Sequence, residues 1–165
     1  MKKFLVLLVL VVAGIYGVGR IRLGEAGAMR FLAQMDSMMT SGKGEEICEM
    51  FHEDLEIDIT DQTGDRPLHL SGGKKEFCEI TVTAAANLNV LPHSMTVNFT
   101  EVETKSDWLH PWTSDVSYLE NRTLTIPATN VTFRTVSNDE ITLVHTFSGV
   151  KLRKLKSAVY KADAT

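Results

Sequence analysis

The spacing of apolar residues changes at Pro92, and this change limits the fold more than any other feature of the chain. Before Pro92, apolar residues mostly recur every three or four positions, which is typical of amphipathic helices. After it, apolar and polar residues alternate, as Met95, Val97 and Phe99 do with the residues between them, which is typical of half-buried strands. Helices followed by a run of strands predict an α+β fold in which helices cover one face of a sheet.

Three helices are expected in the first part of the chain. The first covers about residues 25–40 and stops at a glycine-containing break, and the second covers about 45–52. A short hairpin is expected over 55–70, because apolar and acidic residues alternate in its first half. Ser71 is a suitable N-cap for a third helix, which Pro92 ends.

The later strands are expected to form an antiparallel meander. The alternation slips near Val102, which predicts a β-bulge, and the next long strand covers 116–126. Residues 131–136 and 141–152 then pair across a turn at 137–139, where Ser, Asn and Asp are common turn formers. The predicted fold is therefore α+β, with three N-terminal helices packed on a curved antiparallel sheet and an apolar helix in front of them.

The first residues of the chain indicate export. Two lysines precede an uncharged run, residues 4–18, that is rich in leucine and valine, as in segments that enter the export machinery. Residues 1–23 are therefore interpreted as a signal-anchor or a signal peptide, and 24–165 as the exported domain. Small residues are poorly placed for cleavage, so we expect residues 4–23 to stay in the membrane, with the domain periplasmic or extracellular. The alternative is a domain secreted after cleavage.

Charge and motif content exclude several classes of function. The chain has 17 basic and 21 acidic residues, a formal charge of −4, and no basic face with interleaved aromatics, so nucleic acid is not an expected partner. The sequence also lacks the spacing of a zinc-protease helix, a calcium loop, a nucleotide-binding glycine loop or a G-x-S-x-G motif. We therefore expect no metal and no cofactor.

Two segments resemble a known superfamily. Residues 47–57 read ICEMFHEDLEI at the end of the short helix, and residues 71–77 read SGGKKEF at the start of the third helix. With the order of helices, hairpin and strands, they make residues 25–155 resemble the nuclear transport factor 2-like superfamily, also called SnoaL-like or cystatin-like cone folds. That superfamily includes steroid isomerases, dehydratases, polyketide cyclases, transport adaptors and periplasmic domains of secretion systems. The resemblance implies a cone-shaped domain and leaves enzyme, binder and scaffold open.

A cone fold implies a cavity, and the strand alternation predicts which side chains face it. Tyr118, Glu120 and Arg122 share a face with apolar residues of their strand, and His145 shares a face with Ile141 and other apolar residues. Ionisable groups in a partly apolar pocket acquire shifted pKa values that suit acid–base chemistry. The alternative is that Glu120 and Arg122 meet solvent where the sheet leaves the core, with His145 a core residue.

Two further pairs of residues have roles that the sequence leaves open. Trp108 and Trp112 form either an aromatic lid or partner contact, or a cover packed on the open end of the cone. Cys48 and Cys78 lie on the second and third helices, 30 residues apart. We expect these two thiols to lie close together without a bond, with a disulfide as the alternative.

The expected function is non-enzymatic. The domain is interpreted as a binding or accessory subunit for a protein partner, for another copy in an oligomer, or for a small apolar ligand. The alternative is a small-molecule isomerase, dehydratase or cyclase that uses Glu120 or His145 as its base.

Overall fold

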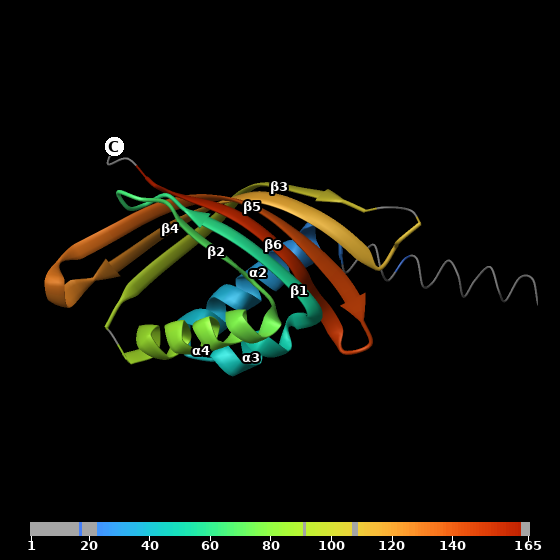
Figure 1. The fold of residues 1–165 in the computed structure, drawn as a ribbon, viewed down its shortest axis with the longest axis horizontal. Coiled ribbons are helices and arrows are strands. Elements are labelled where there is room, and N and C mark those ends of the chain that lie inside the picture. The colour runs from blue at the N-terminus through green and yellow to red at the C-terminus, as the bar shows by residue number, and fades with distance from the viewer. Residues whose placement is uncertain (1–16, 18–22, 91, 107–108, 163–165) are drawn as a thin grey trace, which may run out of the picture.

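Helices cover the concave face of a curved sheet in the computed structural model of the chain, which describes residues 17, 23–90, 92–106 and 109–162 (Figure 1). The helices are α2 (Glu25–Thr40), α3 (Gly44–Glu49) and α4 (Lys74–Val90). The strands are β1 (Phe51–Asp61), β2 (Leu68–Gly72), β3 (Ser94–Lys105), β4 (Thr113–Ile126), β5 (Val131–Thr146) and β6 (Gly149–Lys161), with a 3₁₀ turn, η1 (Pro127–Thr129), between β4 and β5.

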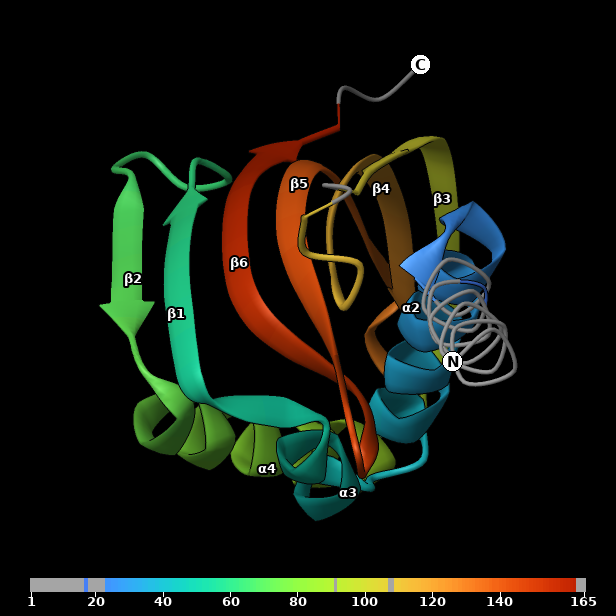
Figure 2. The same ribbon diagram turned by 90° about the vertical axis from the view of Figure 1, so that its right-hand side faces the viewer.

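The sheet is mixed, which corrects the prediction of a purely antiparallel sheet. Its strand order is β2-β1-β6-β5-β4-β3, as Figure 2 shows. Neighbours pair antiparallel except β1 and β6, which are parallel. The chain leaves the β1–β2 hairpin through α4, starts the meander at the far edge with β3, and returns to place β6 beside β1. Local residue patterns do not predict this closing pair, because it joins strands about 100 residues apart.

The core lies between α2 and the concave face of the sheet. Ala28, Phe31 and Leu32 are the buried face of α2, at the spacing that predicted this helix, and they belong to one cluster with Val116 of β4 and Leu143 of β5. Each of the larger side chains, such as Phe31 and Leu32, contributes about 1.5 to 3 kcal/mol by leaving water. Packing on the sheet therefore fixes α2, whose predicted bounds, 25–40, are confirmed.

Two boundaries near the short helix differ from the prediction. Helix α3 ends at Glu49, and β1 already begins at Phe51, because Phe51 is buried in the core and the Met50 carbonyl accepts a hydrogen bond from the Leu152 amide of β6 (2.8 Å). The predicted N-cap Ser71 lies inside β2.

The predicted turn at 137–139 is wrong. Strand β5 runs without interruption from Val131 to Thr146, and the chain turns later, at 147–148. Ser137 and Asp139 are buried inside the strand, where a cavity accepts their polar groups. The predicted bulge near Val102 is confirmed, because the β3–β4 register shifts between Thr100 and Glu103.

Helices α3 and α4 are held together closely. A Cβ atom on Gly44 would lie 2.5 Å from the Val82 Cα, so the close approach of the two helices requires glycine at that position. Cys48 and Cys78 are joined by a disulfide, with their Cα atoms 5.4 Å apart, so the expectation of two separate thiols does not hold. The layer that covers the concave face is therefore cross-linked.

The predicted apolar N-terminal segment, residues 1–23, lies outside the described residues, apart from Gly17 and Leu23. Leu23 is buried in the core of the domain and so belongs to the fold. Within the described residues, no helix combines the length and the apolar character needed to cross a membrane.

Candidate functional site

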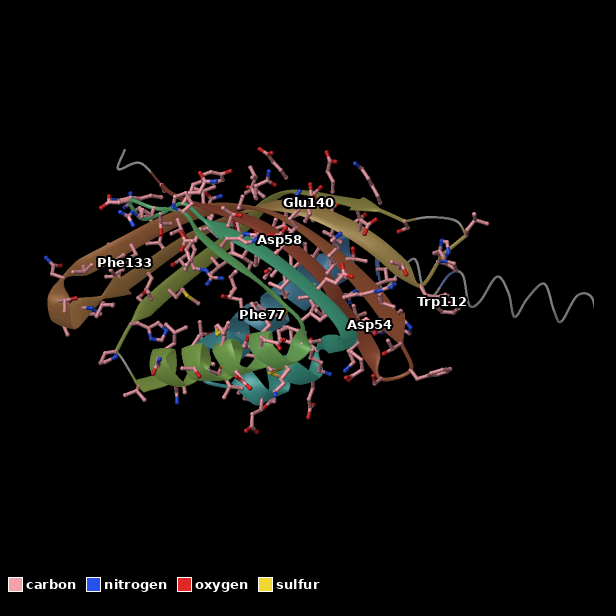
Figure 3. The ribbon with its side chains drawn as sticks, in the orientation of Figure 1. Asp54, Asp58, Phe77, Trp112, Phe133 and Glu140 are labelled. Carbon is pink, nitrogen blue, oxygen red and sulfur yellow. A yellow bond between two sulfur atoms is a disulfide. The ribbon has the colours of Figure 1, made fainter. Side chains whose placement is uncertain are left out.

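A cavity of about 310 Å³ lies between the helices and the concave face of the sheet. Figure 3 shows Phe77 of α4 between that helix and the sheet, whereas Glu140 lies on the convex side. Most of the wall is apolar, with side chains that include Leu32, Met35, Met39, Phe77, Phe99 and Leu155.

One wall of the cavity is a row of alternate residues on β4. Tyr118 is 5% exposed, and the side chains of Glu120 and Arg122 are 14% and 39% exposed, so the row leads outward from the core. The Arg122 Nη2 atom lies 2.8 Å from Glu120 Oε1, which makes an ion pair. The Tyr118 ring meets Phe99 of β3 edge to face, at 5.6 Å between centroids.

The neighbouring strand, β5, adds polar groups that the sequence analysis placed in a turn. Asp139 pairs in register with Tyr118, and Ser137 pairs with Glu120. The Ser137 hydroxyl donates a hydrogen bond to Asp139 Oδ2 (2.9 Å). The other carboxylate oxygen of Asp139 is buried and has no hydrogen-bond partner among the described residues. An unsatisfied buried oxygen costs about 1 to 3 kcal/mol, which makes a purely structural role for Asp139 unfavourable.

Burial shifts the acid–base properties of the whole group. Desolvation raises the pKa of Asp139, and the Ser157 and Ser137 hydroxyls and the Arg122 charge oppose that shift. Desolvation also raises the pKa of Glu120, against the Arg122 charge and with the help of Asp139. Asp36 of α2 lines the same cavity, and burial raises its pKa as well.

Tyr118 is the most strongly shifted group. Its pKa lies well above the usual value, first because the phenol is buried and then because Asp139 and Glu120 add negative charge beside it. The phenol therefore stays neutral at physiological pH, and its hydroxyl is hydrogen-bonded to Asp139. Three carboxyl groups with raised pKa values, one phenol and one guanidinium in a mostly apolar cavity form a set that can hold or transfer a proton.

His145 lies away from this group. It is on β5 with the predicted parity but six residues beyond Asp139, which is about 20 Å along a strand. Its ring centroid is 6.1 Å from that of Trp112, and its amide donates to the Trp112 carbonyl (2.7 Å). The structure thus brings together Tyr118, Glu120 and Arg122 and leaves the fourth predicted residue at the β3–β4 loop.

Trp108 lies outside the described residues, so the predicted tryptophan pair is represented by Trp112 alone. No group of His, Cys, Asp and Glu in the described part of the chain is arranged to hold a metal ion.

Among the cavity residues that the sequence did not predict are Asp36, Ser137 and Asp139. A signal for Asp36 existed, because it is four residues after Leu32 and so falls on the apolar face of its helix. A signal for the other two existed as well, since Ser137 and Asp139 continue the alternation of Ile141 and Leu143.

Comparison with known proteins gives the fold. No family model matches the chain, and no curated protein matches it. Among solved structures, a candidate scytalone dehydratase from Novosphingobium aromaticivorans is 9% identical, with a TM-score of 0.63, and the match covers 92% of this chain and 93% of that one. A nuclear transport factor 2-like protein with a cystatin-like fold from the same species is 13% identical (TM-score 0.61; 94% and 90% covered).

A third similar structure is the beta subunit of a benzoate 1,2-dioxygenase from Burkholderia mallei. It is 11% identical, with a TM-score of 0.63, and the match covers 81% of this chain and 89% of the subunit. The chain therefore has the nuclear transport factor 2-like, cystatin-like cone fold. At these identities the likeness defines the fold and leaves the activity to the site.

Proposed function

We propose that the domain binds a small, mostly apolar molecule bearing a carbonyl or hydroxyl group in its cavity and catalyses a proton transfer on it. The observation that carries the proposal is the cluster of Tyr118, Glu120 and Asp139 in an apolar cavity. Burial raises the pKa of all three groups. Burying carboxyl groups in this way destabilises a fold. Their presence therefore favours a role in binding or catalysis.

Each group has a role in such a reaction. Tyr118 remains neutral, so its hydroxyl turns from Asp139 to donate a hydrogen bond to the oxygen of the bound molecule. Glu120 is the proton acceptor, since its side chain is the more accessible of the two carboxyl groups on the sheet. Arg122 balances the charge that Glu120 carries before it takes the proton. In a dehydration, the base removes a proton from the carbon beside a carbonyl, and a proton returned to the leaving hydroxyl releases water.

The likeness to a candidate dehydratase supports this class of reaction. The charge of the cavity narrows the ligand further. With three acidic groups against one arginine, the cavity repels carboxylated ligands and favours neutral ones.

We also propose that the domain is exported and stays anchored through the apolar run of residues 4–18, since Leu23 is already part of the domain core. The support is the pair of lysines and the uncharged run of residues 4–18 in the sequence. Detergent, and not high salt, is expected to release the full-length chain from a membrane fraction. Mature protein that begins near Gly19 or later contradicts the anchor.

A binding or accessory role without turnover is the second candidate. One carboxylate oxygen of Asp36 and one of Asp139 are buried. Because a buried oxygen does not contact a bound molecule, this observation favours a role without turnover. The likeness to a dioxygenase beta subunit is compatible with this role.

The two candidates separate in one experiment. The wild type and the variants Glu120→Gln and Glu140→Gln are titrated with the neutral aromatic alcohol 2-naphthol, and they are screened for turnover of β-hydroxy ketones by the absorbance of the unsaturated product. We expect turnover to fall about a hundredfold or more in Glu120→Gln. It should persist in Glu140→Gln, whose side chain lies on the convex face. Binding of 2-naphthol without turnover of any β-hydroxy ketone selects the accessory role, and failure of both contradicts the proposed site.

A further inference from the structure

Three loops meet at one end of the domain, away from the cavity group. Gly24, which precedes α2, lines a surface depression with Thr104 and Ser106, where β3 ends. The β3–β4 loop leads from there to Trp112, which contacts His145 near the end of β5. The β5–β6 turn at 147–148 follows directly. Figure 3 shows Trp112 at this end of the molecule.

Large apolar side chains in these loops face solvent. Leu109 is 61% exposed, Trp112 is 40% exposed, and Phe147, at the tip of the β5–β6 turn, is fully exposed. Because Phe147 is fully exposed, its side chain contributes no packing to the turn. Apolar residues gathered on loop tips are typical of a surface that meets an apolar partner.

We propose that these residues, the loop rim of Leu109, Trp112 and Phe147, rest in the interfacial layer of the phospholipid bilayer. The inference depends on the anchor proposed above. Residue 18, the last of the apolar run, is six residues before Gly24, a reach of at most about 20 Å. An anchor that ends near residue 18 therefore holds the rim within contact distance of the bilayer. Tryptophan is enriched at this depth because its ring is apolar and its N–H is polar.

This placement gives the cavity an orientation. Arg122, the most exposed member of the β4 row, is nine residues from Thr113, or about 30 Å along the strand from the rim. The open side of the cavity thus faces water, and a ligand approaches from solution.

Charge does not explain the contact. Lys105 and Lys151 lie near this end, but Asp115 and Glu49 accompany them, and the Lys151 ammonium donates to the Glu49 carbonyl. We therefore expect the rim to bind a neutral phosphatidylcholine surface, with little dependence on salt.

The test uses the full-length chain in vesicles. Trp108→Phe leaves Trp112 as the chain's one tryptophan, because the sequence has two. Its fluorescence is measured in phosphatidylcholine and in brominated phosphatidylcholine, and then with aqueous iodide. Phe147→Ser is added to remove part of the rim, and Phe133→Ser, at the far end of β5, is the matched control.

We expect brominated lipid to quench Trp112 about twofold or more, as for an interfacial tryptophan. The effect should weaken in Phe147→Ser and persist in Phe133→Ser. If the chain floats with vesicles and Trp112 is quenched by iodide but not by brominated lipid, contact between the rim and lipid is contradicted. The membrane anchor is then retained. Protection of Trp112 from both quenchers shows that it contacts protein, which also contradicts contact between the rim and lipid. Chain that does not float removes the anchor and the rim together, with no consequence for the cavity.

Discussion

A glutamate on the concave face of the sheet and a glutamate on the convex face lie in opposite environments. Glu120 of β4 points into the cavity, where burial raises its pKa and Arg122 is its paired cation. Glu140 of β5 points to the convex face, where it is exposed and lies opposite Lys156 of β6 in the register. Neighbouring strands thus present one glutamate to a mostly apolar cavity and one to water.

Charge balance separates the faces further. On the convex face, Lys156 lies between Glu140 of β5 and Asp58 of β1, so charges alternate across the strands in water. Such exposed pairs contribute little to stability and cost little. On the concave face, acidic groups outnumber the arginine; Asp139 is buried, and Glu120 and Asp36 are partly buried. The carboxyl groups of the cavity lower the stability of the fold, so their presence indicates a function. Those of the convex face have little effect on stability and indicate none.

The largest effect is expected in the layer that covers only the concave face. Replacing Cys48 and Cys78 by serine should lower the free energy of unfolding by about 3 to 4 kcal/mol, the loop-entropy value for this separation. Hydrogen exchange should quicken in α3 and α4 and stay unchanged in the central strands. Mass spectrometry after alkylation without reductant checks the bond itself. Modification of both cysteines would contradict it.

A core substitution sharpens the contrast between faces. Leu143 of β5 is fully buried on the concave side, so Leu143→Ala should cost about 2 to 5 kcal/mol in urea unfolding. Val144, the next residue, has the opposite parity and is partly exposed, so Val144→Ala should cost about 1 kcal/mol or less. Equal costs would contradict the assignment of the two faces.

A smaller effect is expected in the pH dependence of stability. Because folding raises the pKa of Glu120, the folded state binds its proton more tightly than the unfolded state does. Stability contributed by the neutral form is therefore present at low pH and is lost as the pH rises from the unfolded to the folded pKa. Asp36 and Asp139 act in the same direction.

Glu120→Gln should accordingly flatten this loss and raise the free energy of unfolding at neutral pH by about 1 kcal/mol or less. Glu140→Gln should leave both the slope and the stability within about 0.5 kcal/mol. Both variants are measured by urea unfolding from about pH 4, near the unperturbed carboxyl pKa values, to about pH 8. A steeper loss in Glu120→Gln than in the wild type would contradict the direction of the pKa shift.

Local pattern was enough to predict much of the fold. The bounds of α2 and the bulge near Val102 follow from periodicity, which neighbouring residues determine. The parallel pairing of β1 with β6 could not be predicted in this way, because it depends on where the chain returns after the meander.

The site was predicted only in part, for a related reason. Parity placed Tyr118 and His145 on one face, and Tyr118 lines the cavity whereas His145 does not, because parity does not say how far along a strand a side chain lies. Ser137 and Asp139 were interpreted as a turn because their side chains often stabilise turns. In this domain the same polar groups are buried in a strand, where a cavity takes the place of solvent.

The most direct test of the cavity is a map of where a neutral ligand binds. Backbone and side-chain NMR shifts are recorded for the domain while 2-naphthol is added. We expect shifts for Tyr118, Glu120 and Asp139 and none for Glu140 and Lys156 on the convex face. Shifts confined to the convex face or to the loop rim, or no shifts at saturating 2-naphthol, would contradict the concave face as the functional site.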